Sequence, residues 1–167
     1  MIQIILIKQL IKMGTRSLTH VIETWKDDKT GKKKKACIMT MYRQYDGYPS
    51  GMGNDLAEFL NKGKLVNGIS VSETALVFNG VGCLSAQIVA HFKEGPGGIY
   101  LYKPMSKDCG EEYTYEIEVD YDTRNINFKC YEIGYTNKKG DYVNKKRLLY
   151  NGSPSEYSKW LEKYETA

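Results

Sequence analysis

One stretch of the sequence combines side chains that bind small anions and flat rings with a glycine-rich turn. It reads YRQYDGYPSGMGND over residues 42–55. The guanidinium of Arg43 offers parallel N–H donors to a phosphate or carboxylate, and the rings of Tyr45 and Tyr48 suit stacking on a flat ligand. A helix beginning near Asn54 would also aim its first backbone amides at an anion. The stretch therefore predicts an anion-binding site.

The same stretch also has a purely structural interpretation. Glycine and proline at positions 47, 49, 51 and 53 are turn-forming residues, and Arg43 and Asp46 are able to pair and brace the turn. Residues 46–55 are then an irregular connection between a strand and a helix. The sequence leaves both interpretations open.

A second polar cluster, GTRSLT, occupies residues 14–19. If the strands beside the two clusters pair, Arg16 and Arg43 face one pocket; in the alternative, Arg16 is a surface arginine on an edge strand. The expected ligand-binding residues are Thr15, Arg16, Ser17, Tyr42, Arg43, Gln44, Tyr45, Asp46, Tyr48, Gly51, Gly53 and Asn54.

Other catalytic patterns are missing from the sequence. The two histidines, His20 and His91, have no partner at metal-binding spacing, so no metal site is expected. A nucleophile elbow, a phosphate-binding Walker loop and a dinucleotide fingerprint after a strand are all absent, and no cofactor is expected. The enzymatic alternative uses Asp46, Glu58 and a tyrosine as acid–base groups for phosphodiester or glycosidic chemistry.

Four segments of the chain resemble a family of small uncharacterised proteins of bacteriophages and large DNA viruses. They are MGTRSLT from Met13, MYRQYDGYPSGMGNDLAEFL from Met41, FNGVGCLSAQ from Phe78 and GGIYLY from Gly97. The resemblance implies a viral setting and supplies no activity. The chain departs from the family's pattern at Met52, where a polar residue such as His is expected.

Small viral proteins that lack catalytic machinery often act by binding, for example by sequestering a host nucleotide signal or an immune protein. We therefore expect a protein that binds a nucleotide or another phosphate-bearing ligand, rather than an enzyme. Two alternatives stay open. One is a protein-interaction module that inhibits a host factor through the sheet face or the terminal helix near Trp160, and the other is a nucleotide-processing enzyme.

The charge distribution argues against a nucleic-acid partner. The net charge is only +4, whereas nucleic-acid binders usually carry a stronger and more continuous basic face. The lysine and arginine runs at 32–35, 138–139 and 145–147 lie beside turn residues. We interpret them as solvated hairpin turns.

The cysteines and the first residues bear on the location of the protein. Cys37, Cys83, Cys109 and Cys130 form no close pair, which favours a reducing, cytoplasmic compartment in a host cell. Residues 1–12 are too short and too interrupted to span a bilayer, so no membrane partner is expected. We interpret 1–12 as an N-terminal extension and 13–167 as a single domain.

The hydrophobic patterns predict an α+β fold. A mostly antiparallel sheet of about five to six strands is expected to carry two to three helices on one face. Its exposed edges permit a homodimer. Strands are predicted at 15–25, 36–45, 97–104, 113–121, 126–133 and 145–151, with an irregular stretch at 64–80 that holds a short element at 75–78. Helices are predicted to begin at 53–54, at 79–80 and after a capping box at 153–156.

Overall fold

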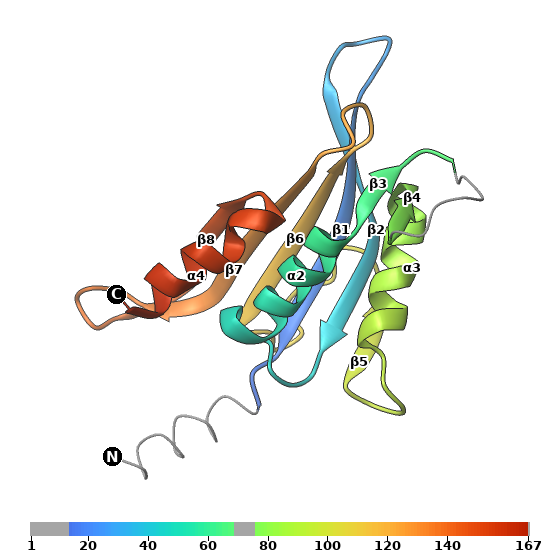
Figure 1. The fold of residues 1–167 in the computed structure, drawn as a ribbon. Coiled ribbons are helices and arrows are strands. Elements are labelled where there is room, and N and C mark those ends of the chain that lie inside the picture. The colour runs from blue at the N-terminus through green and yellow to red at the C-terminus, as the bar shows by residue number, and fades with distance from the viewer. Residues whose placement is uncertain (1–13, 69–75, 167) are drawn as a thin grey trace.

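The computed structural model describes residues 14–68 and 76–166 (Figure 1). The predicted extension at 1–12, and residues 69–75 of the predicted irregular stretch, lie outside the described residues. Among the residues described, no helix combines the length and the apolar character that a membrane span requires.

A six-stranded sheet forms the centre of the fold, in the order β5-β2-β1-β6-β7-β8. Neighbouring strands in it are antiparallel except for the parallel pair β1–β6. The α+β class and the mostly antiparallel sheet predicted from the sequence are confirmed. The strands are β1 (Ser17–Lys26), β2 (Lys33–Arg43), β5 (Ile99–Tyr102), β6 (Tyr113–Asp120), β7 (Ile126–Thr136) and β8 (Tyr142–Gly152).

The helices lie on one face of this sheet, as Figure 1 shows from the helix side. A short parallel pair, β3 (Lys64–Val66) with β4 (Val77–Asn79), connects two of them. The described helices are α2 (Asn54–Lys62), α3 (Gly80–Phe92) and α4 (Tyr157–Thr166), and the short turns η1 (Pro49–Gly53) and η2 (Pro154–Glu156) precede α2 and α4. The three predicted helices are therefore confirmed.

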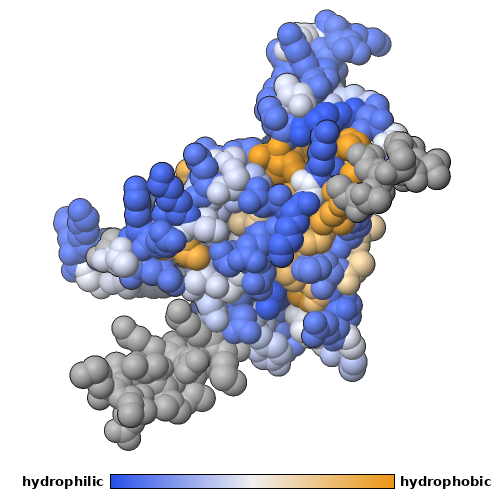
Figure 2. Space-filling view, in the orientation of Figure 1, coloured by the Kyte–Doolittle hydropathy of each residue, from blue (hydrophilic) through white to orange (hydrophobic). Residues whose placement is uncertain are grey.

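The hydrophobic core fills the space between the helices and the helix side of the sheet. Alternate residues of each strand point to this side, and the facing sides of the helices are apolar. Figure 2 shows the outer surface of α2 and α4 as largely hydrophilic, with apolar residues gathered around α3 and the short strands. Fully buried members include Val21, Met41, Ile117 and Phe128 from the sheet and Leu56, Leu84 and Ile88 from the helices.

Strand β6 is more buried than its sequence predicts. Its strict alternation of polar and apolar residues predicts a half-exposed strand, but Thr114 and Glu116 on its polar side are 4% and 8% exposed. The connection over residues 103–112 covers that side, because the Met105 amide donates to Thr40 and the Glu112 amide to the Arg16 carbonyl. A covering loop leaves no local sequence pattern, so the alternation is misleading here.

Two other local predictions are wrong in detail. The segment at 46–55 is irregular only in part, since η1 forms helical turns that are kinked at Gly51, whose φ and ψ of −101° and −105° are not helical, and it runs directly into α2. The expected capping box at 153–156 is also absent: the Ser153 hydroxyl bonds to the Ser155 hydroxyl at 2.9 Å instead of a backbone amide. The short turn η2 starts the helix instead, with the Glu156 amide donating to the Ser153 carbonyl.

Two buried tyrosines hold the glycine-rich turn against the sheet. The Tyr115 hydroxyl donates to the Gly47 carbonyl at 2.8 Å, and the Tyr157 hydroxyl donates to the Pro49 carbonyl at 3.2 Å. The tyrosines also press against Gly53, where an added Cβ would lie 2.9 Å from the Tyr115 ring and closer still to the Tyr157 hydroxyl. Glycine at 53 is therefore required by the close approach of the two rings.

This packing predicts opposite outcomes for two helical glycines. Gly53→Ala should destabilise the protein by about 1–3 kcal/mol through overpacking. Gly82→Ala, in α3 where nothing lies within 4 Å of the added carbon, should stabilise it by about 0.5–1 kcal/mol because alanine has the higher helix propensity. Urea unfolding followed by circular dichroism measures both. A stable Gly53→Ala variant would contradict the close approach.

Candidate functional site

Two adjoining hollows meet at Arg43, and we call them together the Arg43 groove. One has a volume of about 220 Å³ and the other about 360 Å³, and Arg43, Phe92 and Glu94 line both. The first is completed by Tyr45, Asp46, Gly97, Gly98 and Ile99, and the second by Asp55, Glu58, Phe59, Lys62 and His91. The groove thus lies where the end of β2, the start of α2 and the end of α3 come together.

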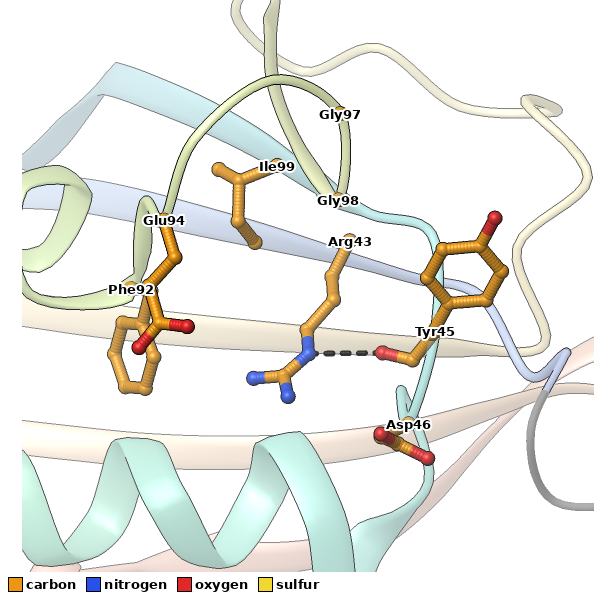
Figure 3. A pocket seen from close by; sticks show the side chains of 8 residues that line it. All are labelled: Arg43, Tyr45, Asp46, Phe92, Glu94, Gly97, Gly98 and Ile99. Carbon is orange, nitrogen blue, oxygen red and sulfur yellow. Dashed lines mark hydrogen bonds between the residues drawn. The ribbon is translucent and has the colours of Figure 1, made fainter.

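The strand register places Arg43 on the helix side of the sheet. Arg43 is the last residue of β2, opposite Ser17 of β1 and Ile99 of β5. Its Nε donates to the Tyr45 carbonyl at 2.8 Å, the interaction drawn in Figure 3. Its Nη1 lies 2.9 Å from the Met52 sulfur and 3.5 Å from a carboxylate oxygen of Asp55.

One edge of this guanidinium remains available to a ligand. Nη2 makes no hydrogen bond with any of the described residues, and the side chain is 21% exposed. In Figure 3 the guanidinium lies between Glu94 and Phe92 on one side and Tyr45 and Asp46 on the other. Arg43 therefore has a fixed position and free donors that face the groove.

Carboxylates outnumber cations around Arg43. Asp46, Asp55, Glu58 and Glu94 line the groove against Arg43 and Lys62. Burial raises the pKa of Asp55, and the positive charge of Arg43 opposes that shift. Burial likewise raises the pKa of Tyr48, with Asp46 adding to the effect. The groove as a whole carries net negative charge.

The backbone amides of the glycine-rich turn are not available to an anion. The Met52 amide donates to the Asp46 carbonyl at 2.8 Å, and the Gly51 and Gly53 amides donate to the Tyr48 carbonyl at 3.0 and 3.4 Å. The Asn54 amide is bonded within the same turn. The expectation that these amides converge on an anion is therefore wrong, because the turn's own carbonyls occupy them.

The structural interpretation of the glycines is correct at Gly47. Its amide donates to the Thr15 carbonyl at 2.9 Å, and an added Cβ would lie 2.7 Å from the backbone of Arg16 and Ser17. The turn is packed directly on the start of β1. This contact places the two polar clusters of the sequence side by side.

Arg16 and Tyr42 point to the opposite side of the sheet from Arg43. Successive strand residues alternate between faces, and Arg16 lines a separate hollow of about 370 Å³, 3.7 Å from a carboxylate oxygen of Glu112. Tyr42 stacks on Tyr102 with ring centres 5.1 Å apart. The expectation that Arg16 and Arg43 share a pocket is therefore wrong.

The other expected residues have mixed placements. Ser17 and Thr15 are buried, and the Ser17 hydroxyl has no hydrogen-bond partner among the described residues. The Gln44 amide donates to the Gly98 carbonyl, and the Asn54 side chain donates to Glu58 at 2.9 Å. Of the expected set, the structure brings Arg43, Tyr45 and Asp46 together in the groove.

Sequence reasoning missed the far wall of the groove. Phe92 is the last residue of α3, and Glu94 and the 97–99 segment follow it. The segment reaches Arg43 because β5 pairs with β2. The run Gly-Pro-Gly-Gly at 95–98 signals a turn, but that signal does not say which strand the turn adjoins. This wall of the groove therefore depends on the pairing of β2 with β5, which are far apart in the sequence.

The burial of Asp55 predicts how its removal changes stability with pH. Because its pKa is raised above 3.8 in the native state, the native protein holds this proton more tightly than the unfolded chain, and stability falls as pH rises through that window. The stability of Asp55→Asn relative to the wild type should therefore increase between about pH 3.5 and 6.

Asp27 serves as a control because its pKa is shifted in the opposite direction to that of Asp55. Its pKa is lowered by the ion pair with Lys34 and by hydrogen bonds from Thr30, so its contribution to stability is lost as pH falls. Asp27→Asn should lose stability relative to the wild type as pH rises, with most of the change below about pH 5, where the carboxyl of the unfolded chain titrates. Urea unfolding at several pH values tests both, and equal slopes for the two variants would contradict the assignment.

Comparisons with known proteins leave the chain without an assigned relative. No family model matches it, and no curated protein or solved structure matches it either. The resemblance to bacteriophage and large-DNA-virus proteins stays a prediction, and the groove itself has to carry the functional argument.

Proposed function

We propose that the protein binds a small ligand of the mononucleotide type, carrying one anionic group, in the Arg43 groove. The observation that carries this proposal is the free edge of the Arg43 guanidinium, fixed by the Tyr45 carbonyl and open to both hollows. A fixed guanidinium with unoccupied donors is a preorganised site for a phosphate or carboxylate group.

The rest of the lining supports a ligand with a flat body and several hydrogen-bond donors. Phe92 lines both hollows, and Tyr45 is 51% exposed, so each offers a surface for stacking. The carboxylates of Asp46 and Glu94 accept hydrogen bonds from sugar hydroxyls or from the amino groups of a base. A nucleoside with a single phosphate combines these features.

The net negative charge disfavours ligands with several phosphates. A di- or triphosphate gains the same contact with Arg43 but brings further anionic charge close to four carboxylates. Like charges in a partly buried site repel. In the viral setting that the sequence resemblance suggests, such a protein would sequester a host immune signal of the mononucleotide or cyclic mononucleotide class.

Catalysis is the second candidate function. Asp46 lines one hollow and Glu58 the other, so both carboxylates border the groove and are candidates for acid–base groups. A protein-interaction role near Trp160 has less support. Trp160 packs on Tyr150 and Tyr157, with ring centres 5.2 and 5.0 Å away.

The proposal predicts selective nucleotide binding. Isothermal titration with AMP, cyclic AMP, ADP and ATP should give affinities that decrease as phosphates are added. Arg43→Gln should weaken AMP binding about ten- to hundredfold, because a hydrogen bond to a charged group contributes about 1.5–3 kcal/mol. Arg16→Gln is the matched control and should bind AMP as the wild type does.

Chromatography of the released ligand separates binding from catalysis. AMP recovered unchanged supports a sequestering protein. AMP recovered as another compound would make the protein an enzyme, and Asp46→Asn should then abolish turnover while binding persists. The absence of binding by all four nucleotides, or equal binding by Arg43→Gln and the wild type, would overturn the proposal.

A further inference from the structure

The face of the sheet opposite the helices holds a cluster of buried polar side chains. His20 lies opposite Thr40 on β2 and beside Glu116 on β6. Their exposures are 4%, 1% and 8%. Thr114 and Glu111 are buried in the same region. Buried polar groups are uncommon unless they pair or serve a ligand, so this cluster calls for a physical explanation.

A hollow of about 260 Å³ opens beside His20. The 103–112 connection forms one wall of it and the start of β8 another. Its lining residues are His20, Met105, Ser106, Lys107, Asp108, Glu111, Thr114, Ile133, Asn144, Lys145 and Lys146.

The chain holds the loop wall in a strained shape. Met105 and Asp108 have φ angles of 61° and 58°, in the left-handed region that residues other than glycine rarely adopt. The Met105 amide donates to the Thr40 hydroxyl at 2.9 Å, and both oxygens of the Glu111 carboxylate accept amides of the loop, at 3.1 and 2.7 Å. Backbone strain of this kind tends to gather at functional sites.

A hydrogen bond orients the ring of His20 through one of its two nitrogens. Its Nδ1 lies 2.8 Å from the Thr40 hydroxyl, while Nε2 makes no hydrogen bond with any residue in the described part of the chain. Burial lowers the pKa of His20, and the charge of Glu116 opposes that shift. A neutral imidazole presents a single donor or acceptor at the remaining nitrogen.

The two buried carboxylates beside the hollow, Glu111 and Glu116, already have hydrogen-bond partners, whereas two of its lysines have no ion pair. Lys146 donates to one oxygen of Glu116 at 2.6 Å, and the Tyr131 hydroxyl donates to the other at 3.2 Å. By contrast, Lys107 and Lys145 form no ion pair with another described residue. Asp108 is the remaining acidic lining residue, so two lysines without an ion pair line the hollow together with one carboxylate that forms no ion pair with another described residue.

We propose that this hollow binds a small organic acid. Its carboxylate lies between Lys107 and Lys145 and meets Nε2 of His20. Its apolar body packs on Met105 and Ile133, which supply the apolar part of the lining. The site is on the opposite face of the sheet from the Arg43 groove, so either proposal can fail without the other.

Benzoate is the probe, since it joins one carboxylate to one flat apolar body. Acetate lacks the body and benzamide lacks the charge. In a titration followed by ¹⁵N NMR of the histidine rings and the backbone amides, benzoate should shift the His20 ring and the 105–108 amides in a saturable way. Acetate and benzamide should bind more weakly, and AMP should leave these signals unchanged.

Two lysines on the β7–β8 hairpin give a matched pair of variants. Lys145→Gln should weaken benzoate binding about tenfold, the effect of losing one charged contact of about 1.4 kcal/mol. Lys138→Gln removes the same charge outside the hollow and should bind as the wild type does. His20→Gln should weaken binding while Lys138→Gln does not.

Three results would overturn the proposal. The first is no saturable shift with benzoate up to its solubility limit. The second is equal binding of benzamide, which would show that the charge has no role. The third is equal weakening by Lys145→Gln and Lys138→Gln, which would show that only the net charge of the hairpin matters.

Discussion

The hydrogen bond from the Tyr115 hydroxyl to the Gly47 carbonyl joins the centre of the sheet to the glycine-rich turn. Tyr115 is completely buried, and an unpaired buried hydroxyl costs about 1–3 kcal/mol. The turn is therefore held at one distance from the sheet, with Tyr157 fixing it at Pro49. Because β2 ends just before this turn and α2 begins just after it, the same contact positions both sides of the Arg43 groove.

The sheet separates two chemically different faces through the alternation of its strands. On the helix side, Arg43 ends a column of core residues and opens into a groove rich in carboxylates. On the other side, His20 and Glu116 form a polar cluster beneath a loop. A shift of one residue in the β1–β2 register would exchange these sets, so the core that fixes the register also determines where each charged group lies.

Much of the fold could be predicted from the sequence because its signals are local. The helix from Asn54 and the hairpin of β6 and β7 follow from periodicity and turn residues. The burial of β6 could not be predicted, since it depends on a loop that leaves no periodic pattern. In the candidate site, Arg43 and its neighbours in sequence were found. Phe92 and Glu94 were missed because strand pairing and helix packing bring them there.

His20 was missed for a related reason. Its partners lie on neighbouring strands, Thr40 on one side and Glu116 on the other, and spacing rules along the chain cannot detect a cluster that forms across strands. The prediction for Arg16 was wrong for the opposite reason. Arg16 lies close to Arg43 in the strand register, but strand alternation places its side chain on the other face of the sheet. On the helix side, residues close to Arg43 in the sequence are also close to it in space, because the turn leads directly from Arg43 into α2.

Under the proposed function, the charged residues around Arg43 would favour some anionic ligands over others as well as attract them. Two unit charges about 4 Å apart near a protein surface interact by about 4 kcal/mol before salt screening. A ligand with one anionic group gains that attraction from Arg43 and offers hydrogen-bond donors to the carboxylates. Each additional anionic group has no second arginine to meet and adds repulsion from residues such as Asp55 and Glu94. In the proposed function, one arginine set among carboxylates would therefore select a ligand by the number of its charges, which an all-basic pocket does not do.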